Sequence, residues 1–366
     1  MAKKTKYKLL KLMFAAANTI VAVLLAFSLP ASFTHASDYP FIAVLGLYYP
    51  VILIVNLIFM LFWLFVKKRY VIISAVVIFF GISNLAHTFN FSINNNTETD
   101  SMQIKVLSYN VRQFQADDKF TKLIVKNDIL SFIVKQKADI VCLQEFQSHN
   151  KNIYEPLKKI RDTLNSGTYY YESYYSPRYN YLTGLVIFSK NKAVNKGKLK
   201  FEGSRTFAIY TDLLINDDTL RVFNIHLASI SLTPSDIDFV VKPEVEDNKA
   251  FRNKATEVYS KLTNAFILRQ KQAELLAEEI KGSPFKILLA GDFNDTPSSF
   301  VYKNIEDLLV DAFSEKGLGM GISYAGKIPF LRIDYIFASH ELEILDFKKH
   351  KILRSDHYPI SAIYKN

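Results

Sequence analysis

Three uncharged apolar runs dominate the first hundred residues of the chain. They cover residues 12–29, 41–66 and 70–89. About 20 apolar residues in a helix cross a hydrocarbon core of roughly 30 Å, so each run is long enough to span a bilayer. Buried helices of water-soluble proteins rarely continue so far without a charge. The pattern therefore predicts a transmembrane anchor of three helices within residues 1–93, with the lipid bilayer as its partner.

The basic residues beside these runs predict an orientation. Five lysines precede the first run, Lys67-Lys68-Arg69 separates the second from the third, and residues 30–40 contain no Lys or Arg. Lys and Arg near short loops stay cytoplasmic, so three spans that begin inside end outside. Thr34-His35-Ala36 also resembles a signal-peptide cleavage site, and cleavage there would leave two spans. Both alternatives predict a multi-pass protein of the inner or plasma membrane with an extracytoplasmic C-terminal domain.

A polar linker, residues 94–101, leads into a second region, 102–366, where strand-like and helix-like patterns alternate. Helical spacing occurs over 119–135 and 248–281. The strand-like runs are 103–111, 138–146, 169–175, 184–189, 205–215, 219–227, 285–293, 332–338, 341–347 and 357–364. This alternation predicts an α/β domain of packed sheets covered by helices, without internal repeats.

Composition and charge narrow the function classes. A hydrophobic content of 49% with 22% charged residues excludes a disordered or fibrous chain. The net charge of +10 divides equally between residues 1–100 and 101–366, so the second region is too mildly basic to select nucleic acid by itself. The single cysteine, Cys142, excludes an internal disulfide and a cysteine-rich zinc module, and its apolar surroundings predict a core position.

Polar side chains gather where the predicted strands end or begin. The six segments are Ser108-Tyr109-Asn110-Val111-Arg112, Gln144-Glu145, Asn224-Ile225-His226, Gly291-Asp292-Phe293-Asn294, Arg332-Ile333-Asp334 and Ser355-Asp356-His357. One such residue alone is more often a turn, a cap or a packed histidine. Six segments in one domain favour a shared site, because loops at one sheet edge can direct their side chains to one point.

The inventory of these segments points to metal-assisted chemistry. It contains carboxylates, carboxamides and imidazoles, but no Ser or Cys paired with a base. Oxygen donors of this kind suit a hard divalent cation, and the imidazoles are then available for proton transfer or charge stabilisation.

The six motifs, in this order, resemble the endonuclease/exonuclease/phosphatase superfamily, the deoxyribonuclease I-like fold, over essentially all of residues 102–366. The resemblance implies a membrane-anchored, bacterial-type member with a four-layered α/β sandwich, in which helices flank two mainly antiparallel sheets. It also implies hydrolysis of phosphodiester or phosphomonoester bonds with Mg2+ or Mn2+, through in-line attack of water on phosphorus.

The resemblance also implies roles for individual residues. The metal would be held by Glu145, with Asn110 and Asp356 close to it. The catalytic group would comprise His226, Asp292, Asn294, and His357 paired with Asp334. Substrate binding would involve Arg205 and Asn224, although a solvated strand-end charge explains Arg205 equally well.

Several questions stay open at this level. Some relatives carry an acid two residues after the first Asn, where this chain has Arg112, so a single tightly held ion is expected. The substrate is nucleic acid, a phospholipid or another small phosphodiester. A tyrosine cluster between residues 169 and 181 could stack bases, line a head-group pocket or simply pack on a sheet. The rival function is an inactive, membrane-anchored protein that binds a phosphate ligand, and the oligomeric state stays open.

Overall fold

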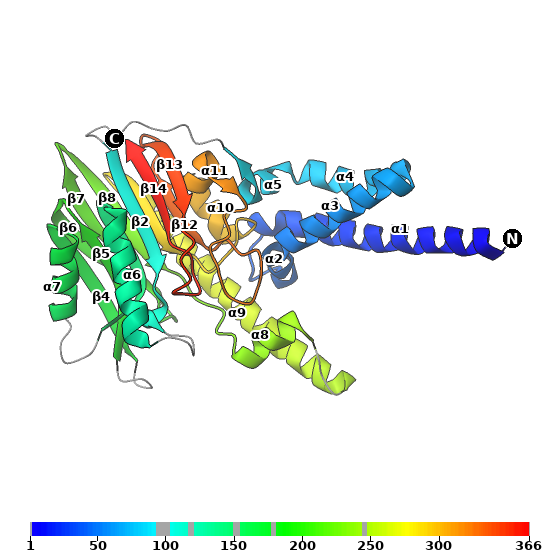
Figure 1. Ribbon diagram of the computed structural model, residues 1–366, viewed down its shortest axis with the longest axis horizontal. Coiled ribbons are helices and arrows are strands. Elements are labelled where there is room, and N and C mark those ends of the chain that lie inside the picture. Colours follow the sequence, from blue (N-terminus) through cyan, green and yellow to red (C-terminus); the bar gives the residue numbers. More distant parts are fainter. Residues whose placement is uncertain are drawn as a thin grey trace.

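The computed structural model describes residues 2–92, 103–115, 121–148, 154–176, 181–243 and 247–365. The predicted linker 94–101 lies outside these residues. An α/β domain carries a group of N-terminal helices that project from one side of it, with the N-terminus at the far end (Figure 1).

Two six-stranded sheets form the α/β domain. The first has the order β13-β14-β2-β3-β5-β4 and comprises Glu343–Lys349, Ile360–Lys365, Gln103–Asn110, Ile140–Ser148, Tyr181–Ser189 and Thr168–Ser176. The second has the order β10-β12-β9-β8-β7-β6 and comprises Val310–Asp311, Asp334–Ala338, Lys286–Asp292, Asp218–His226, Phe207–Ile215 and Lys192–Lys200. Each sheet has one parallel pair at its centre, β2 with β3 and β8 with β9, and its other neighbours are antiparallel.

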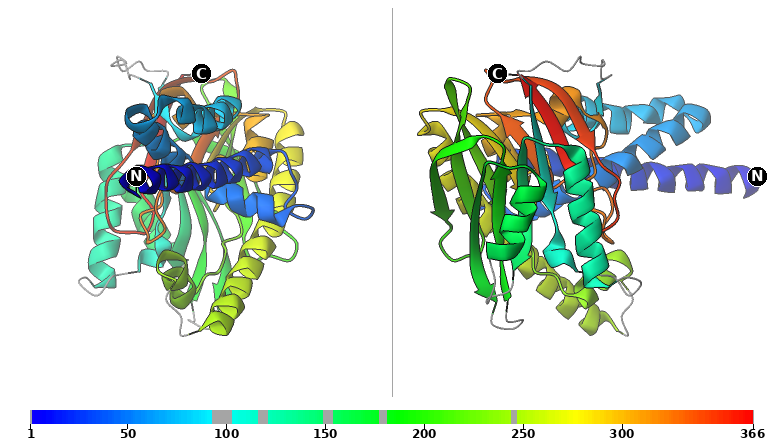
Figure 2. Two further views of the ribbon diagram at one scale, coloured as in Figure 1. Left: turned by 90° about the vertical axis from the view of Figure 1, so that its right-hand side faces the viewer. Right: turned by 60° about the vertical axis from the view of Figure 1, so that its left-hand side comes forward.

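Three hydrophobic cores separate four layers. Between the sheets lie side chains such as Val106, Val222 and the fully buried Cys142, as predicted. Helices α6 (Lys122–Gln136) and α7 (Tyr154–Thr163) cover the first sheet. Helices α9 (Asn248–Lys281) and α10 (Phe300–Glu306) cover the second sheet (Figure 2). The predicted four-layered α/β sandwich is confirmed.

Several elements differ from the predicted ones. Strand β6 was not predicted, because Lys192–Lys200 is an exposed edge strand without alternating apolar residues. Helix α8 (Pro234–Val241) begins at a capping box, in which Thr233 and Asp236 bond reciprocally. The remaining short elements are α11 (Ala312–Lys316), β1 (Asn90–Phe91), β11 (Leu318–Gly319) and the single 3-10 turns Leu29–Ser32, Lys68–Tyr70 and Arg112–Phe114.

The N-terminal region forms five helices: α1 (Ala2–Ser28), α2 (Pro40–Leu47), α3 (Tyr49–Val66), α4 (Val71–Phe80) and α5 (Ile82–Thr88). Two stretches, Thr5–Ser32 and Tyr49–Val66, are long and apolar enough to cross a membrane, and the bent pair α4–α5 could count as a third. The runs 41–66 and 70–89 are thus each divided into two helices. The chain breaks before Pro50, which cannot donate a backbone hydrogen bond, and it bends by 75° at Gly81.

Helices α1, α3 and α4 share a buried polar cluster. Asn18 donates to the Ser74 hydroxyl at 2.7 Å and accepts from the Trp63 indole N–H at 2.9 Å. Ser74 in turn donates to Asn56 at 2.8 Å. All four side chains are fully buried. Such neutral networks join helices in an apolar environment, where an unpaired polar group is costly.

The N-terminal helices also bond directly to the α/β domain. The Arg332 guanidinium donates to the His87 carbonyl at 2.8 Å, and β1 pairs with β11. The Thr296 hydroxyl donates to the Gly46 carbonyl at 3.4 Å. These contacts hold the helices on the side of the domain that carries β12, α10 and α11 (Figure 1).

Candidate active site

The strand register brings three predicted site residues into one row. His226, Asp292 and Asp334 occupy paired positions on the adjacent strands β8, β9 and β12. Gly291 permits this close approach, because a Cβ on it would lie 2.1 Å from the Ile225 carbonyl oxygen. The row lies at the carboxyl end of the parallel pair β8–β9.

Asp292 is the centre of the site. Its Oδ2 accepts from Asn110 Nδ2 at 2.9 Å, across the two sheets, and lies 3.7 Å from His226 Nε2 and 3.6 Å from His357 Nε2. Its Oδ1 accepts from the Asn294 backbone N–H at 2.8 Å. Burial raises the pKa of Asp292, while the two neighbouring imidazoles oppose that rise.

His357 and Asp334 form the predicted pair. His357 Nδ1 lies 2.8 Å from Asp334 Oδ2, and both side chains are buried. Although burial opposes its charge, the carboxylates of Asp334 and Asp292 raise the pKa of His357 to about 10. The imidazole is therefore positively charged at neutral pH, with Nδ1 held by Asp334 and Nε2 directed toward Asp292.

Glu145 lies on the first sheet at the open side of the site. It occupies a bulge in β3, between Leu143 and Phe146, with a left-handed φ of 51°. Its carboxylate accepts from Gln113 Nε2 at 3.2 Å and lies 3.4 Å from Asn110 Nδ2. Its side chain is 25% exposed, so the carboxylate remains accessible to a ligand. Left-handed backbone at a non-glycine residue costs energy and commonly marks a functional position.

Gln113 is a site residue that the sequence did not reveal. It stands in a turn where Arg112, Gln113 and Phe114 all have positive φ. Its carbonyl accepts from the Tyr181 hydroxyl, which holds the amide toward Glu145. The only signal in the sequence was its place just after the first motif.

Asp356 faces Glu145 across the mouth of the site. Burial raises its pKa against the opposing charges of His357 and Arg112, and the nearby Glu145 adds to the rise. Arg112 Nε lies 3.4 Å from Asp356 Oδ2, so a positive charge of the chain itself stands beside this carboxylate. Ser355 fixes the loop by donating to the Asn110 carbonyl at 2.8 Å.

The donor set fits a divalent cation. Ligand atoms of Asp292, Asp334 and His357 lie within 4.8 Å of one another, but His357 and Asp334 are already bonded to each other. Glu145 and Asp356 are about a quarter exposed and offer hard oxygen donors. Asn110 accepts the Arg112 N–H on Oδ1 and turns Nδ2 toward the acids, so in this arrangement it positions Glu145 and Asp292.

The two predicted substrate-binding residues differ in burial: Asn224 is buried and Arg205 is exposed. Asn224 is fully buried below the site, and Nδ2 donates to the carbonyls of Leu143 and Val186 on the opposite sheet. Its Oδ1 accepts from Gln144 at 2.7 Å. With its hydrogen-bonding groups engaged, Asn224 joins the two sheets, and we do not retain it as a substrate contact.

Arg205 is exposed in the bend before β7. Burial raises the pKa of Tyr174, Glu145 adds to the rise and Arg205 opposes it, so Tyr174 lies within reach of both charges. Tyr169 and Tyr171 pack under the helices, whereas Tyr170 and Tyr174 pack between the sheets. Part of the tyrosine cluster, residues 177–180, lies outside the described residues.

Comparison with known proteins agrees with this arrangement. A family model, described as the endonuclease/exonuclease/phosphatase family, matches residues 107–357, which is more than half of the chain. The chain therefore belongs to this family, whose members are mostly metal-dependent phosphodiesterases and nucleases. A second model, a domain of unknown function (DUF8431), matches residues 10–88. No curated protein matches the chain.

Solved structures share the fold. A family protein from Leptotrichia buccalis has 16% identity and a TM-score of 0.52, over 72% of this chain and all of that one. The human Nocturnin catalytic domain with bound sulfate has 18% identity and a TM-score of 0.52, over 75% and 96%. Danio rerio TDP2 in complex with a single-strand DNA product has 16% identity and a TM-score of 0.51, over 73% and 100%. At these identities the likeness concerns the fold.

Proposed function

We propose that the protein is a membrane-anchored, divalent-metal-dependent phosphoesterase that hydrolyses phosphodiester bonds of nucleic acids, lipids or their head groups. The observation that carries the proposal is the arrangement around Asp292. Its buried carboxylate lies within 3.7 Å of two imidazoles, and it is bridged by Asn110 to the partly open Glu145. This combination brings acid/base groups, cationic groups and metal ligands to one point.

Each group of the site then has a defined task. Asp292 accepts the proton of the attacking water, and Asn294, anchored through Nδ2 to the Leu227 carbonyl at 3.0 Å, helps to place that water. The charged His357, held by Asp334, stabilises the negative charge that grows on a phosphoryl oxygen, and His226 flanks the same oxygen from β8. Preorganised charges of this kind usually make the largest contribution to catalysis.

Glu145 and Asp356 would hold the metal ion at the mouth of the site. A bound Mg2+ or Mn2+ supplies Lewis-acid stabilisation of the phosphoryl oxygens. Because Arg112 stands beside Asp356, we propose a single tightly held ion.

We further propose that residues 1–93 anchor the protein through three spans, with 102–366 as an extracytoplasmic catalytic domain. The basic N-terminus of α1 and the Lys67–Arg69 turn both lie at the end of the helices far from the α/β domain (Figure 1). The positive-inside rule places that end in the cytoplasm. The buried Asn18–Trp63 cluster and the separate family match over residues 10–88 support a distinct helical unit.

The rival proposal is a protein that binds a phosphate ligand without turnover. Hydrolysis of bis-p-nitrophenyl phosphate by the full-length protein in detergent separates the two proposals. We expect turnover with Mg2+ or Mn2+ that EDTA abolishes and that added metal restores. Absence of turnover with every divalent metal, together with retained phosphate binding, would favour the rival. A parallel panel of plasmid DNA, RNA and phospholipid vesicles then identifies the substrate class.

A further inference from the structure

An apolar pocket lies where α3 begins, between the N-terminal helices and the α/β domain. Its volume is about 250 Å3. All of its lining residues are apolar or aromatic, and they come from the segment 47–51 of the N-terminal region, from Val240 and Val241 of α8, and from the loop 328–331. Val241 is 45% exposed and Phe330 is 37% exposed, so apolar surface continues from the pocket to the outside.

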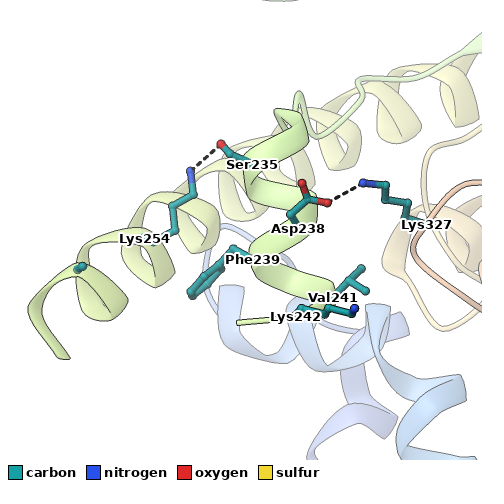
Figure 3. Close-up of a pocket in the computed structure, with 8 residues that line it drawn as sticks. Ser235, Asp238, Phe239, Val241, Lys242, Lys254 and Lys327 are labelled. Carbon is teal, nitrogen blue, oxygen red and sulfur yellow. Dashed lines mark hydrogen bonds and ion pairs between the residues drawn. The ribbon is translucent and has the colours of Figure 1, made fainter. Parts of the chain in front are cut away.

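A second pocket adjoins the first, and Val241 lines both. Three lysines line it: Lys242, which directly follows α8, Lys254 from α9 and Lys327 from the same loop (Figure 3). Asp238 also lines it and pairs with Lys327 at 2.6 Å. Lys254 pairs with the buried Asp236 and, at 3.1 Å, with Glu257. The apolar pocket therefore opens beside a lining with three lysines and one acid, in which Lys254 and Lys327 are ion-paired and Lys242 shows no ion pair among the described residues.

An apolar pocket next to a lysine-lined pocket fits one kind of ligand. If α3 crosses the bilayer, Leu47–Val51 lies at the level where hydrocarbon meets head groups, and the molecules at that level are lipids. A phospholipid has the matching order of parts, a phosphate directly beside apolar chains. Lysines at an interface reach phosphates while their stems cover apolar surface.

We propose that the two pockets together bind one glycerophospholipid of the surrounding bilayer, with the phosphate at Lys242, next to the ion-paired Lys254 and Lys327, and one acyl chain in the apolar pocket. The proposal rests on the membrane location proposed above. It assigns to α8 and the loop 327–331 a task that hydrolysis does not require.

The lipid would lie close to the catalytic groups. The loop that lines both pockets bonds to the loop that carries Asp356 and His357: the Ala325 N–H donates to the Asp356 carbonyl at 2.7 Å, and the Tyr358 N–H donates to the Ser323 carbonyl at 2.7 Å. The Tyr324 ring also stands edge-on to His357, 5.7 Å between centroids. The segment that leads into the pocket-lining loop is therefore hydrogen-bonded directly to the loop that carries Asp356 and His357.

Photocrosslinking tests the proposal. The full-length protein is reconstituted in phosphatidylcholine vesicles that contain a trace of phosphatidylcholine with a diazirine in its acyl chain, and adducts are mapped by mass spectrometry after illumination. We expect adducts on residues 240–241 or 328–331. The Val241→Asp variant places a charge in the apolar pocket and should lower this labelling about tenfold. Val194→Asp, a similarly exposed valine on the edge strand β6, is the matched control and should leave it unchanged.

Lys242→Glu tests the phosphate end and should lower the same labelling about threefold by charge repulsion, whereas Lys192→Glu on β6 should not. Adducts confined to α1 and α3, with none in the pocket, would overturn the lipid site while supporting membrane insertion. Adducts nowhere on the chain would contradict the membrane location itself. Hydrolysis of bis-p-nitrophenyl phosphate by Val241→Asp reports whether that variant is folded.

Discussion

Two buried clusters of polar side chains, one in the N-terminal helices and one in the α/β domain, differ in charge and in access. In the N-terminal helices, Asn18, Asn56, Trp63 and Ser74 are neutral, fully buried and bonded to one another. In the α/β domain, buried acids and a charged imidazole adjoin Glu145, which is a quarter exposed. A closed neutral cluster fixes helix packing, whereas an open charged cluster has groups left for a ligand. This difference separates the proposed anchor from the proposed catalytic site.

The largest expected effect comes from the centre of the charged cluster. Asp292→Asn keeps the size of the side chain and a carbonyl acceptor for Asn110, but it removes the charge and the proton acceptor. We expect kcat for bis-p-nitrophenyl phosphate to fall about a thousandfold or more, with little change in the midpoint of thermal unfolding. Glu343→Gln, the same chemical change at an exposed position on β13, is the control. Activity within tenfold of the wild type would show that Asp292 is not central.

The neutral cluster should respond in the opposite way. Asn18→Leu removes the acceptor of Trp63 and the donor to Ser74, and it should destabilise the helices by about 1–2 kcal/mol without changing kcat. Unfolding by SDS in mixed micelles, followed by the fluorescence of Trp63, the only tryptophan, measures this. Thr19→Val is the control, because Thr19 is exposed and bonds only within its own helix turn. A loss of kcat in Asn18→Leu would mean that the two clusters are coupled.

A smaller effect is expected at Arg112, whose charge faces Asp356. Arg112→Ala should tighten Mn2+ binding about threefold to tenfold, because a competing positive charge is removed from a partly exposed ligand. Calorimetric titration measures the affinity and the number of ions, with one ion expected. Arg112→Lys keeps the charge and should bind Mn2+ within about twofold of the wild type. Weaker binding in Arg112→Ala would mean that the arginine organises the metal site.

The smallest effect is expected at the rim. Arg205→Ala should raise KM about twofold to fivefold with kcat unchanged, because an exposed charge contributes only modest binding energy. Steady-state kinetics checks this, with the exposed Lys200→Ala at the end of β6 as control. An unchanged KM would leave Arg205 as an ordinary surface charge.

Much of the sandwich follows from the sequence, because long apolar runs with polar ends define most strands of both sheets. The apolar run 138–146 contains most of β3, and the predicted helix 248–281 is α9, in the connection between β8 and β9. Edge strand β6 escaped prediction because its pairing with β7, and not its own pattern, holds it. The breaks before Pro50 and at Gly81 show that apolar length alone does not define one helix.

The sequence predicted most residues of the site but not the backbone geometry that positions them. The pairing of Asp334 with His357 was implied by the resemblance to the family, and the structure shows it. The bulge at Glu145 and the turn that presents Gln113 depend on left-handed backbone at non-glycine residues, which no local pattern signals. Asn224 lies two residues before His226 on the same strand, and only the packing of the first sheet against β8 shows that it bonds between the sheets.

We propose that the charged cluster around Asp292 directs water to phosphorus. Hydrolysis of bis-p-nitrophenyl phosphate in H2 18O by the full-length protein with Mn2+ tests it most directly. We expect one 18O atom in each p-nitrophenyl phosphate released and none in p-nitrophenol, with incorporation abolished in Asp292→Asn. Label in p-nitrophenol, or equal incorporation by the wild type and Asp292→Asn, would contradict it.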